Sequence, residues 1–135
     1  MASVKPKEFS YLVGVDRAGR MAAEGEPASL EPGEEWTPDH LLLAAVVRCS
    51  LVALQFHARR MDVDVAASSG VASGRVTIPE GEQRFRFVEI DVELDVTLDP
   101  RPEPTELKSL LERAERDCFV GASLVVKPAY RWNVA

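Results

Sequence analysis

The chain has 135 residues, of which 46% are apolar, and its formal net charge is −6 at pH 7. This length favours a single domain over residues 1–135, with enough apolar side chains for a hydrophobic core. The negative charge argues against nucleic acid and anionic membranes as partners, because both repel an acidic protein.

The N-terminal part is expected to form two short strands and a loop. Apolar and polar residues largely alternate from Phe9 to Val15, which predicts a strand. The stretch DRAG is a plausible turn into a second short strand, RMAAEG, at residues 20–25. The prolines and glycines of GEPASLEPGEEW, residues 25–36, then predict a polar loop.

A long helix is predicted from Pro38 to about Arg60. Thr37 followed by Pro38 is typical of a helix N-cap with proline at the first helical position. One apolar stripe at helical spacing contains Leu42, Ala45, Val46, Cys49, Val52, Ala53 and Phe56. Since the opposite side is also largely apolar, we expect burial on most sides, partly by a second copy of the chain.

The remaining elements predict an α+β domain with its helices packed against an antiparallel sheet. One strand is expected within residues 63–78, and strict alternation from Val88 to Leu98 predicts the next. A bulge near Phe87–Val88 is expected to return Phe85 and Phe87 to the core side. A second helix and a last strand are indicated by Leu107, Leu110, Leu111 and Ala114 and by Tyr130, Trp132 and Val134.

The two cysteines, Cys49 and Cys118, are the main candidates for chemistry. The first residues lack the apolar segment of a signal peptide, so we expect a cytoplasmic protein, in which structural disulfides are uncommon. Cys49 on its apolar stripe is either an inert core residue or a thiol activated by a cation. Arg17 and Arg20 of the first turn are the candidate cations.

Cys118 is expected in the first turn of a short helix, CFVGASLVV, with Asp117 as its N-cap. A helix N-terminus lowers the pKa of a thiol, whereas the charges of Asp117 and Glu115 raise it. The structural and the reactive interpretations of Cys118 therefore both stay open at this stage.

The sequence gives little indication of a metal or a bound cofactor. The cysteines and the two histidines, His40 and His57, show no C-x-x-C or H-x-x-x-H spacing, and we expect no metal site. There is no glycine-rich phosphate loop and no G-x-S-x-G. Both histidines are expected to be ordinary, partly exposed residues.

Two stretches around the cysteines form a recognisable pair. TPDHLLLAAVVRCS, residues 37–50, is an Ala-rich helical stretch with a cysteine near its end, and AERDCFVGASL, residues 114–124, is a cysteine followed by small residues, serine and leucine. Together they resemble the first and second signatures of the OsmC/Ohr family of organic hydroperoxide peroxidases. The resemblance implies a two-layer OsmC-like domain with a long buried central helix, assembled as an intertwined homodimer with active sites at the subunit interface.

The same resemblance implies a thiol-dependent peroxidase. Cys49 would attack the peroxide and become a sulfenic acid, and Cys118 would condense with it to a disulfide that an external dithiol, of lipoyl or thioredoxin type, reduces. The activating arginine falls on Arg17, with Arg20 as the alternate, and Asp39 stands at the glutamate position before the first helix. Phe119 stands where relatives carry proline after the second cysteine.

Two rivals to the peroxidase remain. The first is a non-enzymatic OsmC-like dimer that binds a small apolar or thiol ligand in the interface groove. The second is a structural dimer whose cysteines never react. Peroxide consumption with a dithiol distinguishes the peroxidase from both of them.

Overall fold

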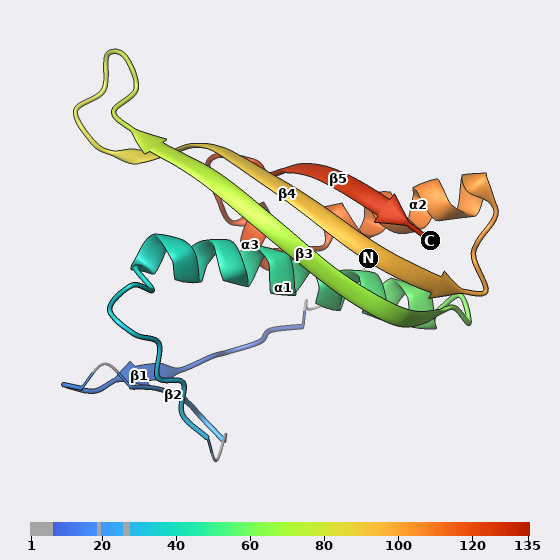
Figure 1. Cartoon of the computed structure of the whole chain (residues 1–135), viewed down its shortest axis with the longest axis horizontal. Coiled ribbons are helices and arrows are strands. Elements are labelled where there is room, and N and C mark those ends of the chain that lie inside the picture. Colours follow the sequence, from blue (N-terminus) through green and yellow to red (C-terminus); the bar gives the residue numbers. More distant parts are fainter. Residues whose placement is uncertain (1–6, 19, 26–27) are drawn as a thin grey trace, which may run out of the picture. The chain divides into compact units, whose positions relative to one another are not determined.

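The computed structural model describes residues 7–18, 20–25 and 28–135, which form two compact units, Met1–Thr37 and Pro38–Ala135. Gly19 of the expected first turn, and Glu26 and Pro27 of the expected loop, lie outside the described residues. The expectation of one domain over the whole chain stays a prediction, and each unit is described by itself. Figure 1 labels the elements β1 (Val13–Val15), β2 (Met21–Ala23), α1 (Pro38–Arg59), β3 (Asp64–Thr77), β4 (Arg86–Asp99), α2 (Pro104–Arg116), α3 (Phe119–Ala122) and β5 (Ala129–Val134).

The N-terminal unit contains an antiparallel hairpin of β1 and β2. Its turn is organised by Asp16, whose Oδ1 accepts hydrogen bonds from the backbone amides of Ala18 at 2.9 Å and Arg20 at 3.0 Å. The first strand is shorter than expected, because the Leu12 amide donates to the Glu24 carboxylate at 2.9 Å instead of to a strand partner. The alternating residues before Leu12 therefore stay outside the ladder.

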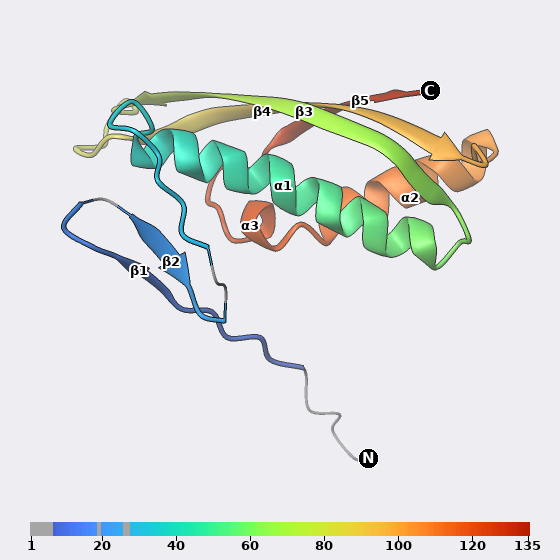
Figure 2. The same ribbon diagram turned by 60° about the horizontal axis from the view of Figure 1, so that its bottom comes forward.

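The C-terminal unit has a three-stranded sheet in the order β3-β4-β5. β3 and β4 are antiparallel, but β4 and β5 run parallel, so the expectation of an antiparallel sheet is wrong for the last strand. The helical connection through α2 and α3 returns the chain to the end of the sheet at which β4 began, as parallel neighbours require. Figure 2 shows the helices of this unit together on one face of the sheet, which makes two layers.

β4 supplies the central row of the core. Its inward residues Ile90, Val92, Leu94, Val96 and Leu98 are all buried, and the acidic residues between them are exposed. The pairing steps from Arg75↔Glu89 to Val76↔Phe87, which leaves Val88 as the extra residue of the expected bulge. The bulge turns Phe87 onto the core, but Phe85, expected there too, lies before the strand and is 72% exposed.

α1 approaches the sheet closely at two glycines of β3, Gly70 and Gly74. A Cβ atom on Gly70 would lie 2.9 Å from Val47 Cγ1 of α1 and 2.5 Å from Leu94 Cδ2 of β4. A Cβ atom on Gly74 would lie 3.2 Å from Leu43 Cδ2. The two glycines lie four residues apart on one face of the strand, so together they make a shallow seat for the helix.

α1 is buried along one face in the single chain. Val46, Ser50, Ala53, Leu54 and Ala58 are its buried residues. Val52 and Phe56, members of the expected buried stripe, are 56% and 55% exposed, because the sheet and α2 cover only one side of the helix. By length and composition α1 could also cross a membrane, a property that core helices of soluble proteins share.

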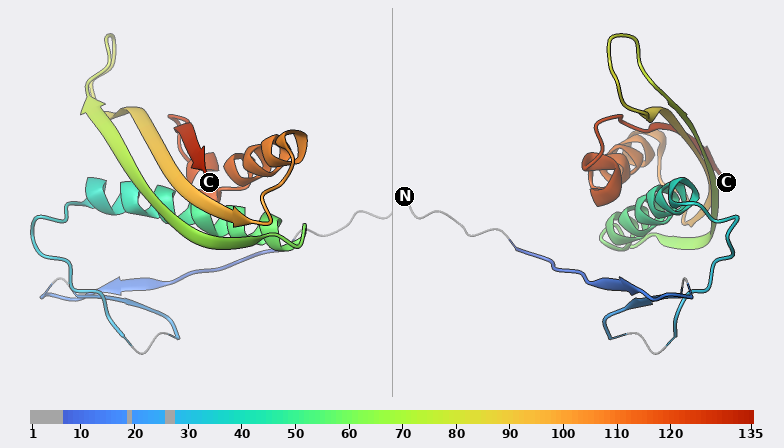
Figure 3. Two further views of the ribbon diagram at one scale, coloured as in Figure 1. Left: turned by 45° about the vertical axis from the view of Figure 1, so that its right-hand side comes forward. Right: turned by 90° about the vertical axis from the view of Figure 1, so that its left-hand side faces the viewer.

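α2 confirms its expected pattern and closes the other half of the core. Leu110 and Ala114 are buried and pack with Leu54 and Ala58 of α1, and Leu107 and Leu111 pack at the edge of this cluster. Figure 3 shows α1 and α2 side by side on the same face of the curved sheet. Cys118 therefore follows a helix that is itself fixed against α1.

Replacing Gly70 with alanine should destabilise the protein by about 1–3 kcal/mol, because the added methyl group overlaps Leu94 and Val47. Ser69→Ala, at the exposed neighbour, is the matched control. Urea unfolding followed by circular dichroism measures both. Alanine normally stabilises a strand relative to glycine, so equal or greater stability of Gly70→Ala would show that α1 is not seated this closely.

Candidate functional site

The structure brings the two cysteines together. Cys49 lies in the middle of α1 and is half-buried, whereas Cys118 precedes α3 and is fully buried. Both are free thiols, and they lie close enough for each to shift the pKa of the other. Two sulfurs separated by 68 residues of sequence therefore meet where α1 contacts α3.

The start of the short helix differs from the expected one. Asp117 is the C-cap of α2, and Cys118 itself is the N-cap of α3, which spans only Phe119–Ala122. The Cys118 Sγ accepts the hydrogen bond of the Gly121 amide at 3.4 Å, as the oxygen of a capping side chain would. The sulfur thus takes the position that was expected for the aspartate carboxylate.

Two hydroxyl groups complete the surroundings of Cys118. The Ser50 Oγ lies 3.5 Å from the Cys118 Sγ and 3.0 Å from the Tyr130 hydroxyl. Ser50 also donates to the Val46 carbonyl within α1 at 2.7 Å. Sequence reasoning missed both residues, although a serine next to Cys49 inside an apolar helix stripe was a detectable signal.

These contacts shift the pKa values of the two thiols in opposite directions. Burial raises the pKa of Cys118, but hydrogen bonds from Ser50, the Gly121 amide, Cys49 and Tyr130 outweigh it, and the net shift is downward. Burial and the contact with Cys118 raise the pKa of Cys49, although the backbone of Val120 opposes them. In this arrangement Cys118 therefore ionises more readily than Cys49.

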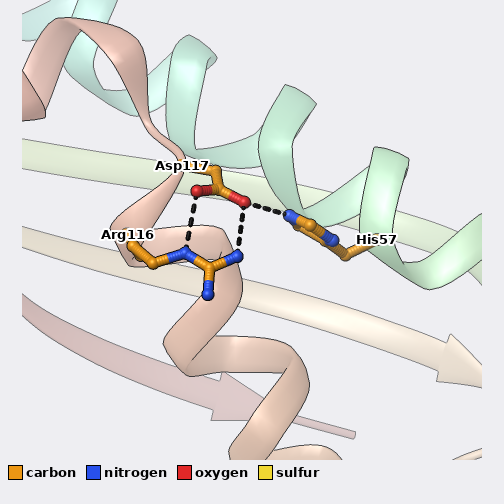
Figure 4. Close-up of polar contacts among 3 residues, drawn as sticks. All are labelled: His57, Arg116 and Asp117. Atoms are coloured by element: carbon orange, nitrogen blue, oxygen red, sulfur yellow. Dashed lines mark hydrogen bonds and ion pairs between the residues drawn. The ribbon is translucent and has the colours of Figure 1, made fainter. Parts of the chain in front are cut away.

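A second polar cluster holds the chain immediately before Cys118. Figure 4 shows the Asp117 carboxylate between the His57 ring of α1 and the Arg116 guanidinium. The His57 Nε2 lies 2.6 Å from Asp117 Oδ2, and Arg116 Nε and Nη2 donate to Oδ1 and Oδ2, both at 2.9 Å. The hydrogen bond from Arg116, followed by that from His57, lowers the pKa of Asp117 to about 2.

The histidines differ from each other more than expected. His57 is partly exposed, as expected, with 11% of its side chain accessible, and it links α1 to the end of α2. His40 is exposed in the first turn of α1. Within residues 7–18, 20–25 and 28–135, no group of three or more His, Cys, Asp or Glu residues could hold a metal ion.

The remaining candidate residues lie at two other places. Asp39 is exposed in the first turn of α1, ten residues before Cys49 in one continuous helix, and about 15 Å of rise separates the two. Arg17 is exposed at the hairpin turn of the N-terminal unit, and the alternate, Arg20, bonds Asp16 at 2.9 Å. The pairing of either arginine with Cys49 stays a prediction.

Residues 31–133, which include both cysteines, match the family of OsmC-like proteins. The chain belongs to the OsmC-like protein family. This assignment confirms the resemblance carried by the two cysteine signatures. No curated protein matches this chain by sequence.

Solved structures show the same fold. An OsmC-like protein of unknown function from Vibrio cholerae superposes with a TM-score of 0.71 at 15% identity, over 94% of this chain and 99% of that one. An OsmC-like protein from Mycoplasma pneumoniae gives 0.66 at 15% identity, over 97% and 98%. An organic hydroperoxide resistance protein from Bacillus subtilis gives 0.55 at 16% identity, over 94% and 98%.

Asp117→Asn should reduce stability at pH 7 by no more than about 1 kcal/mol, because the carboxylate is more than a third exposed and solvent screens its ion pairs. The folded pKa of Asp117, about 2, lies below its ordinary value of 3.8, so its contribution is present above about pH 4 and fades as pH falls toward 2.

Urea unfolding at several pH values between 7 and 3 checks this. The difference between wild type and Asp117→Asn should shrink at the acidic end. Asp91→Asn, at an exposed carboxylate of β4, is the control. A difference that stays constant down to pH 3 would contradict an electrostatic role for Asp117.

Proposed function

We propose that this OsmC-like chain is a thiol-dependent peroxidase that reduces organic hydroperoxides. The observation that carries the proposal is the closeness of two free thiols, one half-buried on an apolar helix and one fully buried, each of which shifts the pKa of the other. Two neighbouring free thiols are what disulfide formation requires. A purely structural role would not require cysteine at either position.

The proposed chemistry uses both sulfurs in turn. The Cys49 thiolate attacks one peroxide oxygen and the O–O bond breaks, so Cys49 becomes a sulfenic acid and the alkoxide that leaves takes a proton from solvent to become an alcohol. Cys118 then attacks the Cys49 sulfur and releases water as the disulfide forms. An external dithiol returns both cysteines to thiols and is itself oxidised to a disulfide.

Apolar side chains around Cys49 support an organic substrate. Val52 and Phe56 follow Cys49 at i+3 and i+7 on α1, and both are more than half exposed. Phe119, which follows Cys118, is 59% exposed. Because each buried CH₂ group contributes about 0.8 kcal/mol, an alkyl hydroperoxide should bind here better than hydrogen peroxide does.

The raised pKa of Cys49 makes an activating cation necessary in this mechanism. We propose Arg17 for this role, with Arg20 as the alternate, and Asp39 as the carboxylate that positions the arginine. Asp39 is too far along α1 to reach Cys49 of its own chain directly. The proposal therefore includes a homodimer in which Asp39 acts at the site of the partner chain or through the bridging arginine.

Exposed Val52 and Phe56 also support a second copy of the chain on this side of α1, because large apolar side chains that follow one helix face are typical of an interface. The other proposed partners are an organic hydroperoxide and a dithiol reductant of lipoyl or thioredoxin type, and the proposed location is the cytoplasm. The ligand-binding rival predicts the same dimer and no turnover.

Intact mass spectrometry after one equivalent of cumene hydroperoxide tests the proposal. Wild type should lose two hydrogen atoms as the disulfide forms. Cys118→Ser should instead gain one oxygen at Cys49, which dimedone traps, and Cys49→Ser should show neither change and no turnover with a dithiol. Wild-type turnover by Cys49→Ser would contradict the assignment of the nucleophile, and an unmodified wild type would favour the ligand-binding rival.

Arg17→Ala should raise the pKa of Cys49 further and slow its alkylation at neutral pH about tenfold, as the loss of one pKa unit of stabilisation predicts. The rate of reaction with iodoacetamide is measured against pH in a Cys118→Ser background. Arg84→Ala removes an equally exposed charge from the β3–β4 loop and serves as the control. An unchanged profile would contradict a role for Arg17 and leave Arg20, Arg48 or no cation at all, which Arg20→Ala and Arg48→Ala in the same assay distinguish.

A further inference from the structure

We propose that Ser50 and Tyr130 are catalytic residues whose hydroxyl groups hold the sulfur of Cys118 as a thiolate for the disulfide-forming step. This inference rests on the proposed function and extends it to the second half of the cycle. Ser50 comes from α1 and bonds the sulfur that precedes α3, and Tyr130 comes from β5 and bonds Ser50.

The geometry around the sulfur is that of an anion site built from side chains. Ser50 is fully buried and its Oγ lies 3.5 Å from the Cys118 Sγ. The Tyr130 hydroxyl lies 3.0 Å from the Ser50 Oγ. It also lies beside the sulfur, since a Cβ atom on Gly121 would be 3.4 Å from both the Tyr130 hydroxyl oxygen and the Cys118 Sγ. The Gly121 amide donates to the same sulfur at 3.4 Å.

Counting hydroxyl hydrogens shows why the site fits a thiolate. Ser50 has one hydrogen and three neighbours that can accept it, namely the Val46 carbonyl, the Tyr130 oxygen and the Cys118 sulfur. When Cys118 is a thiol, its own S–H points toward the Val46 carbonyl at 3.9 Å. When it ionises, rotation of the hydroxyl groups alone redirects hydrogens to the sulfur.

Burial makes these hydrogen bonds decisive. A thiolate in an apolar interior without donors would be strongly disfavoured, because it loses the hydrogen bonds of water. Tyr130 stays a donor throughout, since burial raises its own pKa well above the ordinary value. The pKa of Cys118 is lowered despite complete burial of the residue, which agrees with this arrangement.

The two hydroxyl groups act in the step that forms the disulfide, and the atoms and electrons of this step balance. The Cys118 thiolate attacks the sulfur of the Cys49 sulfenic acid, the S–S bond forms and the S–O bond breaks. Hydroxide leaves and takes a proton from solvent to become water. No further oxidant is needed, because the hydroperoxide has already oxidised Cys49.

Other titratable groups near the site are few among the described residues. Cys49 faces Cys118 from α1, and Glu115 of α2 faces Tyr130 and accepts a hydrogen bond from Trp132 at 3.4 Å. Burial raises the pKa of Glu115. Asp117 is turned toward Arg116 and His57.

The first experiment measures the pKa of Cys118 without any peroxide. Cysteine labelled with ¹³C at Cβ is titrated by NMR in a Cys49→Ser background, which leaves one reporting cysteine. Tyr130→Phe keeps the ring that stacks on Trp132 and removes only the hydroxyl group. This variant and Ser50→Ala should each raise the pKa of Cys118 by about one unit.

Ser123→Ala is the matched control, because its hydroxyl group bonds the Phe119 carbonyl of α3 and does not contact the sulfur. Its titration should coincide with that of the unmodified background. If Tyr130→Phe also coincides with the background, the inference is overturned, whatever the folding of Ser50→Ala. A shift in Ser123→Ala as large as in Tyr130→Phe would equally overturn it, because helix disturbance would then explain both.

The second experiment follows the reaction itself by rapid-quench mass spectrometry with cumene hydroperoxide. Conversion of the Cys49 sulfenic acid to the disulfide should slow about tenfold at pH 7 in Tyr130→Phe. Raising the pH should restore it, which a purely structural defect would not allow. Equal disulfide rates at pH 7 would overturn the inference.

The two experiments separate this inference from the proposed function. A wild type that never forms the disulfide contradicts the peroxidase, while the NMR titration still decides whether Ser50 and Tyr130 hold a thiolate. If wild type forms the disulfide but the pKa of Cys118 is unchanged in both Ser50→Ala and Tyr130→Phe, the proposed function stands and the inference about the two hydroxyl groups is wrong.

Discussion

The close seat of α1 on the sheet is the constraint from which the site follows. At Gly70 and Gly74 of β3 no side chain stands in the way of the helix, and Val47 and Leu43 of α1 approach these two positions. Once these two residues face the sheet, helical geometry fixes the direction of every other side chain on α1. Ser50 is then enclosed on the buried face, whereas Cys49 lies about 100° around the helix and stays half-exposed.

The second sulfur is fixed by packing and by charge. α2 is held on α1 through Leu54, Ala58 and Leu110, and His57 and Asp117 join the two helices at the point where α2 ends. The next residue is Cys118, so the chain has little freedom in where it places this sulfur. The polar groups of this region satisfy one another: among the described residues, no buried side-chain nitrogen or oxygen lacks a hydrogen-bond partner.

A local sequence pattern predicts some features of the sheet but not the direction of its last strand. Alternation from Val88 to Leu98 determined the buried row of β4, and the change of phase at Phe87 determined the bulge. The direction of β5 could not be deduced in this way, because parallel and antiparallel strands share the same period of two residues. It depends on the path of α2 and α3 between the strands, which is a property of the whole unit.

The sequence by itself determined the long helix from Pro38, the second helix, the core row of β4 and, through two signatures, the family and its pair of cysteines. These features are local: each depends on spacing within one stretch of chain. Only the tertiary structure decided that Cys118 rather than Asp117 caps α3, and that Ser50 and Tyr130 surround its sulfur. Hydrogen bonds among α1, α3 and β5 join residues up to 80 positions apart, and only folding brings them together.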